Sequence, residues 1–429
     1  MVIQRAKGTQ DLLPGIIEKW QYFEETIRAV CQEYGYEEIR TPIFEATELF
    51  QRGVGETTDI VNKEMYTFLD KGERSLTLRP EGTASVCRAY VENKLHAGTL
   101  PLKLYYLGPM FRYERPQTGR FRQFHQFGVE VLGADKPVVD AEVISLVWDL
   151  YRRLGLTGLE VHVNSVGCPS CRSQHSQKLQ DFLAIRRDKL CRDCQERFER
   201  NPMRILDCKN PNCKELTEGT PTTLDLLCPD CSSHFNQLQD FLRVAGVVFK
   251  INPRLVRGLD YYRKTAFEVV VEEIGAQSAI CGGGRYDGLI QEIGGPPTPG
   301  IGFAMGMERV LAALEAQKKL PESGKSRFAM LIALGDDAQR EGFALVSKLR
   351  QDKIPVSIDL LGRSLKAQLK AADRLGVNFA LILGEEELSK QVLAVRDLKL
   401  GQQYEIPLAE AKVSLSQKYR EVKHNDIIS

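Results

Sequence analysis

The sequence has almost no excess of charge of either sign and no long apolar segment. It carries 58 Lys and Arg residues against 57 Asp and Glu residues, so bulk attraction to nucleic acid is not expected, although a local basic surface is compatible with this balance. The longest apolar runs, such as Phe328–Leu334, are far shorter than the roughly 18 residues of a membrane span. The first residues, which include Arg5, Lys7 and Asp11, lack the apolar stretch and cleavage site of a secretory signal. We expect a soluble, cytoplasmic protein with no membrane partner.

The 429 residues, of which 43% are apolar, are enough for two or three domains. Residues 328–429 contain three apolar runs typical of buried strands and two helical segments between them: Phe328–Leu334, Asp337–Gln351, Val356–Leu360, Ser364–Leu375 and Phe379–Leu383. This alternation predicts a small α/β domain of about 100 residues. The charged stretch KKLPESGKSR, residues 318–327, contains Pro and Gly and is predicted to be the linker that precedes it.

Residues 1–317 are predicted to form a domain of the α+β class. An amphipathic helix at Pro14–Tyr34 opens it, an extended stretch follows at Ile39–Phe44, and a helix at Phe303–Gln317 closes it. Short strand signals separated by turns lie between these segments: Leu76–Arg79, Leu102–Tyr113, Phe121–Leu132 and Ala266–Glu272. This pattern favours an antiparallel sheet with flanking helices over regular βαβ units.

Eight of the eleven cysteines fall between Cys168 and Cys231. Besides Cys208-x4-Cys213, they form three Cys-x2-Cys pairs, whose members are candidate zinc ligands because paired spacings in a cytosolic chain favour metal over disulfides: Cys168, Cys171, Cys191, Cys194, Cys228 and Cys231. The cysteines could instead be small buried residues, so both interpretations stay open. Residues 168–240 are polar and helical between the pairs, and we predict that they form an inserted helical domain.

The stretch Phe111–Glu130 places an unusual set of polar side chains on two predicted strands joined by a turn. Because side chains alternate along a strand, Arg112 and Glu114 should share one face of the first strand. One face of the second strand should carry Phe124, Gln126, Gly128 and Glu130, and its core face should carry Phe121, Phe127, Val129 and Val131. An arginine, carboxylates, an amide and an aromatic ring on one floor favour a binding site, although a solvated sheet face with surface ion pairs gives the same pattern.

Two short motifs suit a ligand but also have plain structural explanations. In LRPEGT, residues 78–83, Glu81 and Thr83 stand where a helix begins, so they could bind an ammonium group or simply cap the helix. In GIGFAMGMERVLAAL, residues 300–314, Arg309 lies off the apolar helical seam, so it could be a surface residue or point along the sheet floor at phosphate.

Two further motifs are rich in glycine. In LVRGLDYYRKTAFEV, residues 255–269, Gly258 beside Arg257 would let backbone and ligand approach closely. In CGGGRYDG, residues 281–288, three consecutive glycines could form a backbone wall against a ligand. The second motif fits neither GxGxxG nor the P-loop pattern, so a nucleotide would not be held in those two ways.

Together these elements resemble the three signature motifs of class II aminoacyl-tRNA synthetases: the helix and strand ending at Pro42, the hairpin at Arg112 and the glycine-plus-arginine helix at Arg309. LVRGLDYY and GGGRYDGL resemble the two peptides particular to histidyl-tRNA synthetases. The resemblance covers nearly the whole chain, and residues 328–429 resemble an anticodon-binding domain. It implies a ligase that uses ATP to convert L-histidine to histidyl-adenylate and then transfers the histidyl group to the 3′ end of tRNA(His).

The resemblance also implies the site residues. Those for histidine are Glu81, Gly82, Thr83, Gln126, Glu130, Tyr261 and Tyr262. Glu81, Thr83 and Gln126 would hold the α-amino group, while Glu130 and a tyrosine would bind the two sides of the imidazole. Those for ATP are Arg112, Glu114, Arg120, Phe124, Arg257 and Arg309. Arg112 and Arg257 would be catalytic at the α-phosphate, and Mg²⁺ would bridge phosphates.

Members of this family are usually homodimers, and the insert would clamp the acceptor arm of the tRNA. In the last domain, basic residues recur along one helix and could face the anticodon stem or form a solvated face: Arg363, Lys366, Lys370 and Arg374. The main alternative is a histidine-binding regulatory subunit of histidine biosynthesis on the same fold. It typically lacks the region from Phe328 onward and need not keep all of Arg112, Arg257 and Arg309. An enzyme that makes a small amide through an aminoacyl adenylate would also lack that region.

Overall fold

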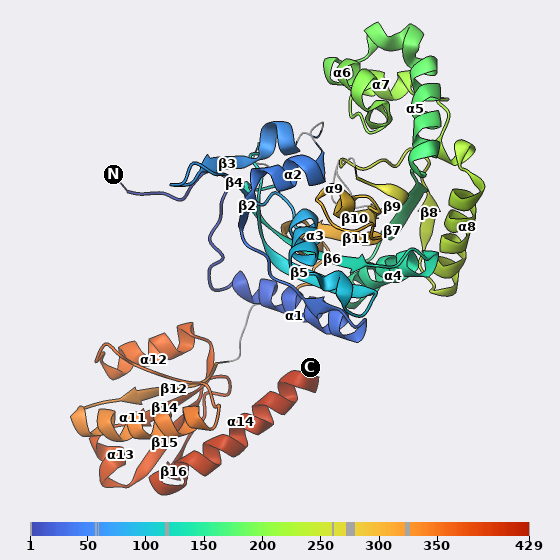
Figure 1. The fold of residues 1–429 in the computed structure, drawn as a ribbon. Helices are drawn as coiled ribbons and strands as arrows, with labels where there is room; N and C mark the ends of the chain where they lie inside the picture. Colours follow the sequence, from blue (N-terminus) through green and yellow to red (C-terminus); the bar gives the residue numbers. More distant parts are fainter. Residues whose placement is uncertain are drawn as a thin grey trace. The chain divides into compact units, whose positions relative to one another are not determined.

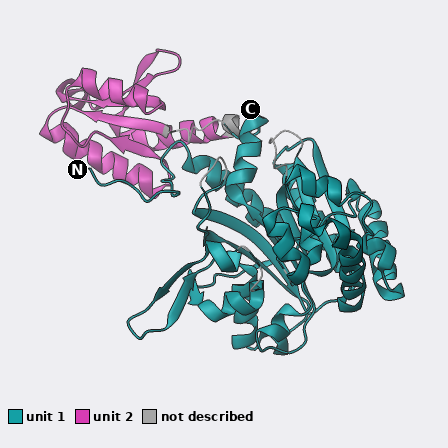
Figure 2. Cartoon of the chain, turned by 90° about the horizontal axis from the view of Figure 1, so that it is seen from above, with its two compact units in different colours: residues 1–321 teal, residues 322–429 magenta. Residues whose placement is uncertain are grey.

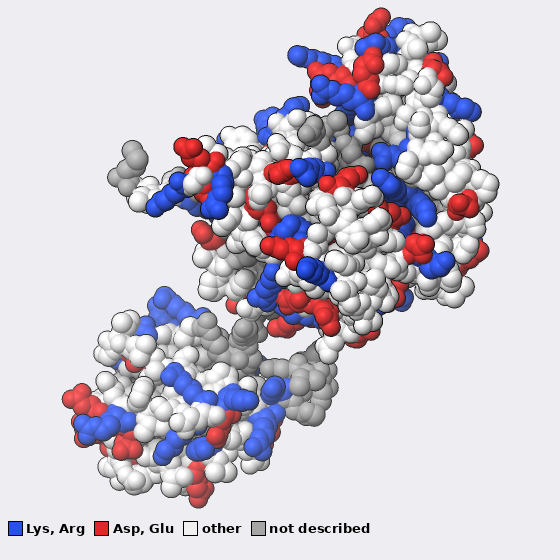
Figure 3. Space-filling view, viewed as in Figure 1, with Lys and Arg blue, Asp and Glu red and all other residues white. Residues whose placement is uncertain are grey.

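The computed structural model describes residues 2–55, 58, 60–115, 120–259, 261–271, 279–321 and 327–428. The chain divides into two compact units, residues 1–321 and 322–429, which Figure 2 shows in separate colours. Residues 322–326 of the predicted linker and 116–119 of the predicted hairpin loop lie outside the described residues. Within the described part, no helix has both the length and the apolar character needed to cross a membrane. On the face seen in Figure 3, acidic and basic side chains are interspersed.

An eight-stranded sheet forms the centre of the first unit (Figure 1). Its strands run in the order β1 (Glu37–Glu38), β5 (Leu102–Phe111), β6 (Gln123–Leu132), β11 (Gly300–Gly306), β10 (Ala279–Arg285), β9 (Arg263–Val271), β7 (Leu159–Ser165) and β8 (Phe249–Ile251). All pairs from β5 to β7 are antiparallel, and only the two edge strands pair in parallel. The predicted antiparallel α+β fold is confirmed.

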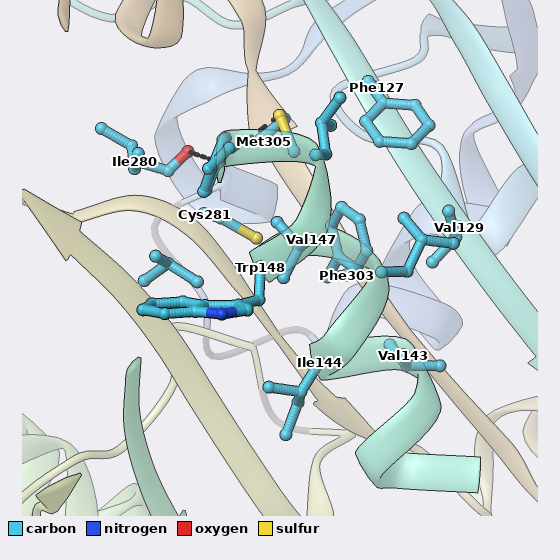
Figure 4. Close-up of a cluster of buried hydrophobic side chains, with 14 of the residues drawn as sticks. Phe127, Val129, Val143, Ile144, Val147, Trp148, Ile280, Cys281, Phe303 and Met305 are labelled. Atoms are coloured by element: carbon cyan, nitrogen blue, oxygen red, sulfur yellow. Dashed lines mark hydrogen bonds between the residues drawn. The ribbon is translucent and has the colours of Figure 1, made fainter. Parts of the chain in front are cut away.

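One face of this sheet packs against helices. The helices that contribute buried residues to this core are α1 (Ile17–Glu33), α4 (Pro137–Arg153), α8 (Pro229–Val244) and α10 (Met307–Ala316). Phe127 and Val129 of β6 lie beside Phe303 of β11 near Val143 and Val147 of α4 (Figure 4). Each fully buried side chain of this kind stabilises the fold by roughly 1.5–3 kcal/mol, so the sheet is held firmly from this side.

The opposite face of the same strands carries very small residues. Gly128 of β6, Ala304 of β11 and Gly282 of β10 lie side by side in register, between Tyr106 of β5 and Glu268 of β9. The three middle positions have a methyl group or no side chain at all, so other side chains lie across them: a Cβ atom at Gly128 would lie 2.3 Å from Tyr106, and one at Gly282 would lie 2.1 Å from Arg257. This floor of small residues positions the site.

The remaining elements of the first unit surround this sheet. A three-stranded sheet and short helices lie near one side: β2 (Phe44–Ala46), β4 (Ser75–Leu78), β3 (Tyr66–Leu69), α2 (Thr47–Val54), η1 (Ile60–Glu64), α3 (Thr83–Glu92), η2 (Leu95–Ala97) and α9 (Leu289–Glu292). Between β7 and α8 the chain is helical, and part of it projects from the sheet in Figure 1: α5 (Pro169–Leu183), η3 (Ala184–Lys189), α6 (Arg192–Arg200), η4 (Pro202–Ile205), α7 (Pro211–Leu216) and η5 (Thr223–Leu226).

Several predicted elements differ from the structure in their bounds. The predicted helix at Phe303–Gln317 is wrong in its first part, because Phe303 lies on strand β11 and the helix begins only at Met307. Phe303 lies four residues before Met307, which is also a helical spacing. The apolar pattern of the helix therefore seemed to begin at this strand residue. In the predicted extended stretch at Ile39–Phe44, Pro42 favours an edge strand or a break, and only Phe44 belongs to a strand, since Pro42 has no backbone N–H to donate.

The second unit is built on a mixed five-stranded sheet, in the order β13 (Val356–Ile358), β12 (Arg327–Ala333), β14 (Val377–Leu383), β15 (Val392–Asp397) and β16 (Gln403–Pro407). Residues Ala329 and Leu331 pack in a core with α11 (Asp336–Gln351) and α14 (Ala411–Ile428). Met330, which alternates with them, packs instead with Ala372 of α12 (Leu365–Arg374). The unit also contains α13 (Glu385–Ser389) and η6 (Leu408–Glu410). Helix α12 therefore covers the face opposite α11.

Candidate active site

A cavity of about 300 Å³ lies over the floor of small residues in the first unit. The residues predicted from sequence that line it are Glu81, Thr83, Arg112, Glu114, Arg120, Phe124, Gln126, Arg257, Tyr261, Tyr262 and Arg309. They come from segments far apart in the chain, which the sheet brings together. Glu130 and Gly82 are the two predicted site residues that do not line the cavity, and both lie directly behind residues that do.

Glu81 is buried at the start of α3. Its carboxylate accepts hydrogen bonds from the backbone N–H groups of Thr83 (2.8 Å) and Ala84 (2.9 Å). Burial raises the pKa of this carboxyl, and the same backbone N–H groups oppose the rise. Helix capping and ligand binding are therefore not exclusive, because Glu81 accepts from backbone N–H groups of the helix N-terminus and also faces the cavity.

Glu130 is fully buried beneath the cavity. Its Oε1 accepts from the Thr83 hydroxyl at 2.7 Å, and its Oε2 accepts from the Tyr286 hydroxyl. Burial raises the pKa of Glu130 to about 8. A Cβ atom at Gly302 would lie 2.0 Å from Oε2, so only glycine leaves room for this carboxylate. Tyr286 lines the cavity and was missed as a site residue, although it stands in the glycine-rich motif.

Tyrosine rings pack together next to Glu130. The ring centroid of Tyr261 lies 4.7 Å from that of Tyr262 and 5.7 Å from that of Tyr286. Gln126 Oε1 is buried and has no hydrogen-bond partner among the described residues. Gly82 packs against a ring, since a Cβ there would lie 2.3 Å from Tyr106. Gln126 and the phenols of Tyr261, Tyr262 and Tyr286 line the cavity.

Arginines also line the cavity. Arg112 donates from Nε to the Pro80 carbonyl at 2.8 Å, and its guanidinium lies 5.3 Å from the Phe124 ring centroid. Glu114 accepts from Arg120 at 3.1 Å and lies 3.9 Å from Arg112. Strand β5 ends at Phe111, so the prediction that Arg112 and Glu114 share a strand face is wrong.

Phe121 is a further residue of the cavity lining. It was predicted to lie on the core face of the second strand, but β6 begins only at Gln123 and Phe121 lines the cavity. Arg309 on α10 also faces the cavity, where Nη1 donates to the Ala279 carbonyl at 2.8 Å. Burial and the nearby Arg120 hold the pKa of Arg309 below its usual value. Two guanidinium groups facing one hollow form a favourable site for an anion.

Arg257 crosses the floor of the cavity. Its Nη1 pairs with Glu268 on β9, while its Nε is buried and has no hydrogen-bond partner among the described residues. A Cβ atom at Gly282 would lie 2.1 Å from Nη2 of Arg257. The glycine run lies on strand β10, where Gly282 lines the cavity and makes room for this arginine.

His125 and Glu308 are a further pair that the sequence did not single out. Glu308 lines the cavity and accepts from the His125 backbone N–H at 2.9 Å and approaches its Nδ1 at 3.1 Å. The His125 ring packs edge-on against Trp20 of α1, with centroids 4.8 Å apart. The contact between His125 and Glu308 ties the start of β6 to the start of α10. Nothing in the sequence indicated this pair, because His125 and Glu308 belong to different motifs 183 residues apart.

An antiparallel sheet, an arginine-bearing hairpin and a β11–α10 segment with glycine and arginine meet around one cavity, and this combination defines a class II aminoacyl-tRNA synthetase. A family model described as "Histidyl-tRNA synthetase" matches residues 8–310, and one described as "Anticodon binding domain" matches residues 329–418. The chain belongs to the histidyl-tRNA synthetase family.

Relatives match over nearly the whole length. A "Histidine--tRNA ligase" of Desulfitobacterium hafniense is 73% identical over 421 residues, which is 98% of this chain and 99% of that protein. The crystal structure of an apo histidyl-tRNA synthetase of S. aureus is 39% identical, has a TM-score of 0.83 and covers 96% of this chain and 100% of its own. A structure from Bacillus halodurans, described as an ATP phosphoribosyltransferase regulatory subunit/histidyl-tRNA synthetase, is 21% identical with a TM-score of 0.66 over 90% of this chain and 99% of its own. It shows likeness of fold alone.

Proposed function

We infer that this chain uses ATP to activate L-histidine and then transfers the histidyl group to the 3′ end of tRNA(His). The observation that carries this inference is a single cavity that combines a buried carboxyl group and phenols with arginines. Its lining includes Glu81, Tyr261, Tyr262 and Tyr286 together with Arg112, Arg120, Arg257 and Arg309. An amino acid has an ammonium group and ATP has a phosphate chain, so both substrates find complementary charge in the same hollow.

Histidine is assigned to the end around Glu130. Glu81, with Thr83 and Gln126, would bind the α-ammonium group. Glu130 would share a proton with one imidazole nitrogen, and a phenol from Tyr261 or Tyr262 would serve the other. Because these groups are buried, an amino acid that leaves them unpaired is rejected without a separate editing site.

ATP is assigned to the end with the arginines. Phe124 would stack on adenine, Glu114 would accept from the adenine or ribose side, and Arg120 and Arg309 would hold the outer phosphates. Mg²⁺ that accompanies ATP would neutralise negative charge on the phosphates. The carboxylate of Glu114 in the cavity lining is of the oxygen type that this ion prefers.

Arg112 and Arg257 are the proposed catalytic residues. In the first step a carboxylate oxygen of histidine attacks the α-phosphorus, and the bond from that phosphorus to pyrophosphate breaks. Negative charge builds on the α-phosphate oxygens, where two fixed guanidinium groups stabilise it. In the second step the terminal ribose hydroxyl of the tRNA attacks the histidyl carbonyl, and AMP leaves.

The rest of the chain is assigned to the tRNA. The inserted helical domain, residues 168–240, would clamp the acceptor arm, and residues 328–429 would bind the anticodon stem. We further propose a homodimer that works in the cytoplasm. The alternative of a histidine-binding regulatory subunit is disfavoured, because this chain has the anticodon-binding match and because Arg112, Arg257 and Arg309 all face one cavity.

Pyrophosphate exchange with ATP and each of the twenty amino acids tests the first step. Exchange with histidine alone is expected. Histidine binding without exchange would favour the regulatory subunit, and exchange with another amino acid would overturn the assignment of Glu130 and the two tyrosines.

Reversing two charges on α12 tests the assignment of the second unit. Lys370 and Arg374 are exposed and line a surface hollow, while the neighbouring Arg363 is held by Asp359. For Lys370→Glu/Arg374→Glu we expect histidine-dependent exchange to stay unchanged and kcat/KM for tRNA charging to fall at least tenfold, with a shallower salt dependence.

The matched control reverses the charges of Arg340 and Lys348, two exposed basic residues of α11. Helix α11 packs on the face of the sheet opposite α12. This control should charge tRNA normally. Equal losses in both double variants would mean that general repulsion, not a docking face on α12, causes the effect.

A further inference from the structure

The eight clustered cysteines separate into two groups of four. The base cluster is defined as Cys168, Cys171, Cys228 and Cys231, and the tip cluster as Cys191, Cys194, Cys208 and Cys213. Within each cluster all four Sγ atoms lie within 4.8 Å of one another. Cys208 and Cys213, which were not among the candidate zinc ligands, thus complete the tip cluster. All eight cysteines are free thiols, and five of them are fully buried or nearly so.

The sulfur separations match those around a single tetrahedral ion. Four sulfurs bound at about 2.3 Å from one Zn²⁺ lie about 3.8 Å from each other. Cys168 Sγ lies 3.6 Å from Cys171 Sγ and 4.0 Å from Cys228 Sγ, and Cys191 Sγ lies 3.8 Å from Cys208 Sγ. A disulfide joins only two sulfurs and leaves the other pair unexplained, whereas one ion accounts for all four.

The surroundings of the sulfurs favour thiolates. Helices α5, α6 and α8 begin immediately after Cys168, Cys191 and Cys228, so three helix N-termini, with their partial positive charge, face the sulfurs. Backbone N–H groups also point at them: that of Cys228 donates to Cys171 Sγ and that of Cys191 to Cys213 Sγ, both at 3.2 Å. Such outer contacts orient ligands and tune a bound metal.

We propose that the base cluster and the tip cluster each bind one Zn²⁺ through four cysteine thiolates. Four protein ligands leave no open position, so both sites are structural. Soft sulfur ligands in a tetrahedral arrangement select zinc over Mg²⁺ or Ca²⁺. Zn²⁺ binding releases the protons of those cysteines that are still thiols. The free energy of metal binding then contributes to the folding free energy of this helical region.

Each site is connected to the active site. Next to the base cluster, Arg172 donates to the Tyr262 carbonyl at 2.9 Å, and the Lys264 N–H donates to the Gly167 carbonyl at 2.9 Å. In the segment between two tip-cluster ligands, Met203 and Arg204 line a small hollow together with Arg257 and Tyr262. The two ions would thus hold the segments that lie against Arg257 and Tyr262.

Metal counting on the full-length protein, purified without chelator, tests the proposal. Mass spectrometry of metals should find two Zn per chain, and a mercurial reagent should release both. Cys171→Ser and Cys194→Ser should each retain one, and the double variant should retain none. Cys31→Ser, a buried cysteine outside both clusters, is the matched control and should retain two.

Cobalt substitution gives a second measurement that needs no variant. The chain with Co²⁺ in place of zinc should show intense sulfur-to-metal charge transfer and the visible bands of tetrahedral cobalt, and both should saturate at two equivalents. Fewer than two metals per chain, an intramolecular disulfide within a cluster, or the same metal loss in Cys31→Ser would overturn the proposal. Because no ATP, histidine or tRNA is present, this outcome is independent of the proposed ligase activity.

Discussion

Arg257→Ala should lower the rate of histidine-dependent pyrophosphate exchange by about 10²–10³-fold, the usual effect of removing one fixed group that stabilises developing charge. Arg257 lies on the cavity floor with Nε unpaired among the described residues and with its far side held by Glu268. The arginine is therefore positioned before the substrate arrives. The loss should appear mainly in kcat, because the charge that Arg257 meets is greatest in the transition state.

A second variant separates chemistry from stability. Arg257→Ala leaves Glu268 partly buried without its partner, which is destabilising in itself. Arg257→Ala/Glu268→Ala removes both charges, so it should melt nearer the wild-type temperature and yet exchange pyrophosphate as slowly as the single variant. Recovery of exchange together with stability in the double variant would show that Arg257 acts only through the fold.

Glu130→Gln should lower kcat/KM for histidine by about 10²–10³-fold, because a buried charged partner of the imidazole is replaced by a neutral amide. The wild-type pH profile should be distinctive. The pKa of Glu130 is raised to about 8, and free imidazole has a pKa of about 6.5. Between these two pKa values the Glu130 carboxyl of the free enzyme is protonated and the imidazole of free histidine is neutral. The two together then carry the one proton that the complex needs. Exchange should therefore fall above pH 8 as that proton is lost, and a continued rise above pH 8 would contradict the assignment.

The same pKa makes a prediction about stability. A carboxyl group whose pKa is raised on folding stabilises the native state fully below its unfolded pKa, and this stabilisation is lost as the pH rises through the folded value. For Glu130 the window runs from about 4.5 to about 8. Wild-type melting temperatures should fall across it, and Glu130→Gln, which keeps the shape of the side chain, should show a flatter dependence.

The alternation along β6 was visible in the sequence because a strand repeats every two residues. Gln126 and Glu130 were therefore placed together on one face, away from Phe127 and Val129, and the structure has them so. Helices α11 and α12 of the second unit were equally visible as periodic apolar patterns, whereas α13 and α14 were not predicted. These features depend only on local periodicity.

Contacts that depend on register were not visible. Tyr286 meets Glu130 because β6, β11 and β10 pair in one particular alignment, although the two residues are 156 positions apart. The division of the cysteines into two groups likewise depends on how the inserted helices fold back. Phe303 was assigned to a helix because strand and helix spacings coincide over a few residues.

Because Gly128, Ala304 and Gly282 are neighbours only in the native strand register, substrate binding depends on correct pairing of β6, β11 and β10. A slip of β11 by one residue would turn Phe303 and Met305 into the hollow and carry Ala304 and Gly302 to the packed side. A chain trapped in that alignment would have no room for a nucleotide or an amino acid. Only molecules whose strands have paired in the native register can load substrate, so catalytic competence reports on the fidelity of folding.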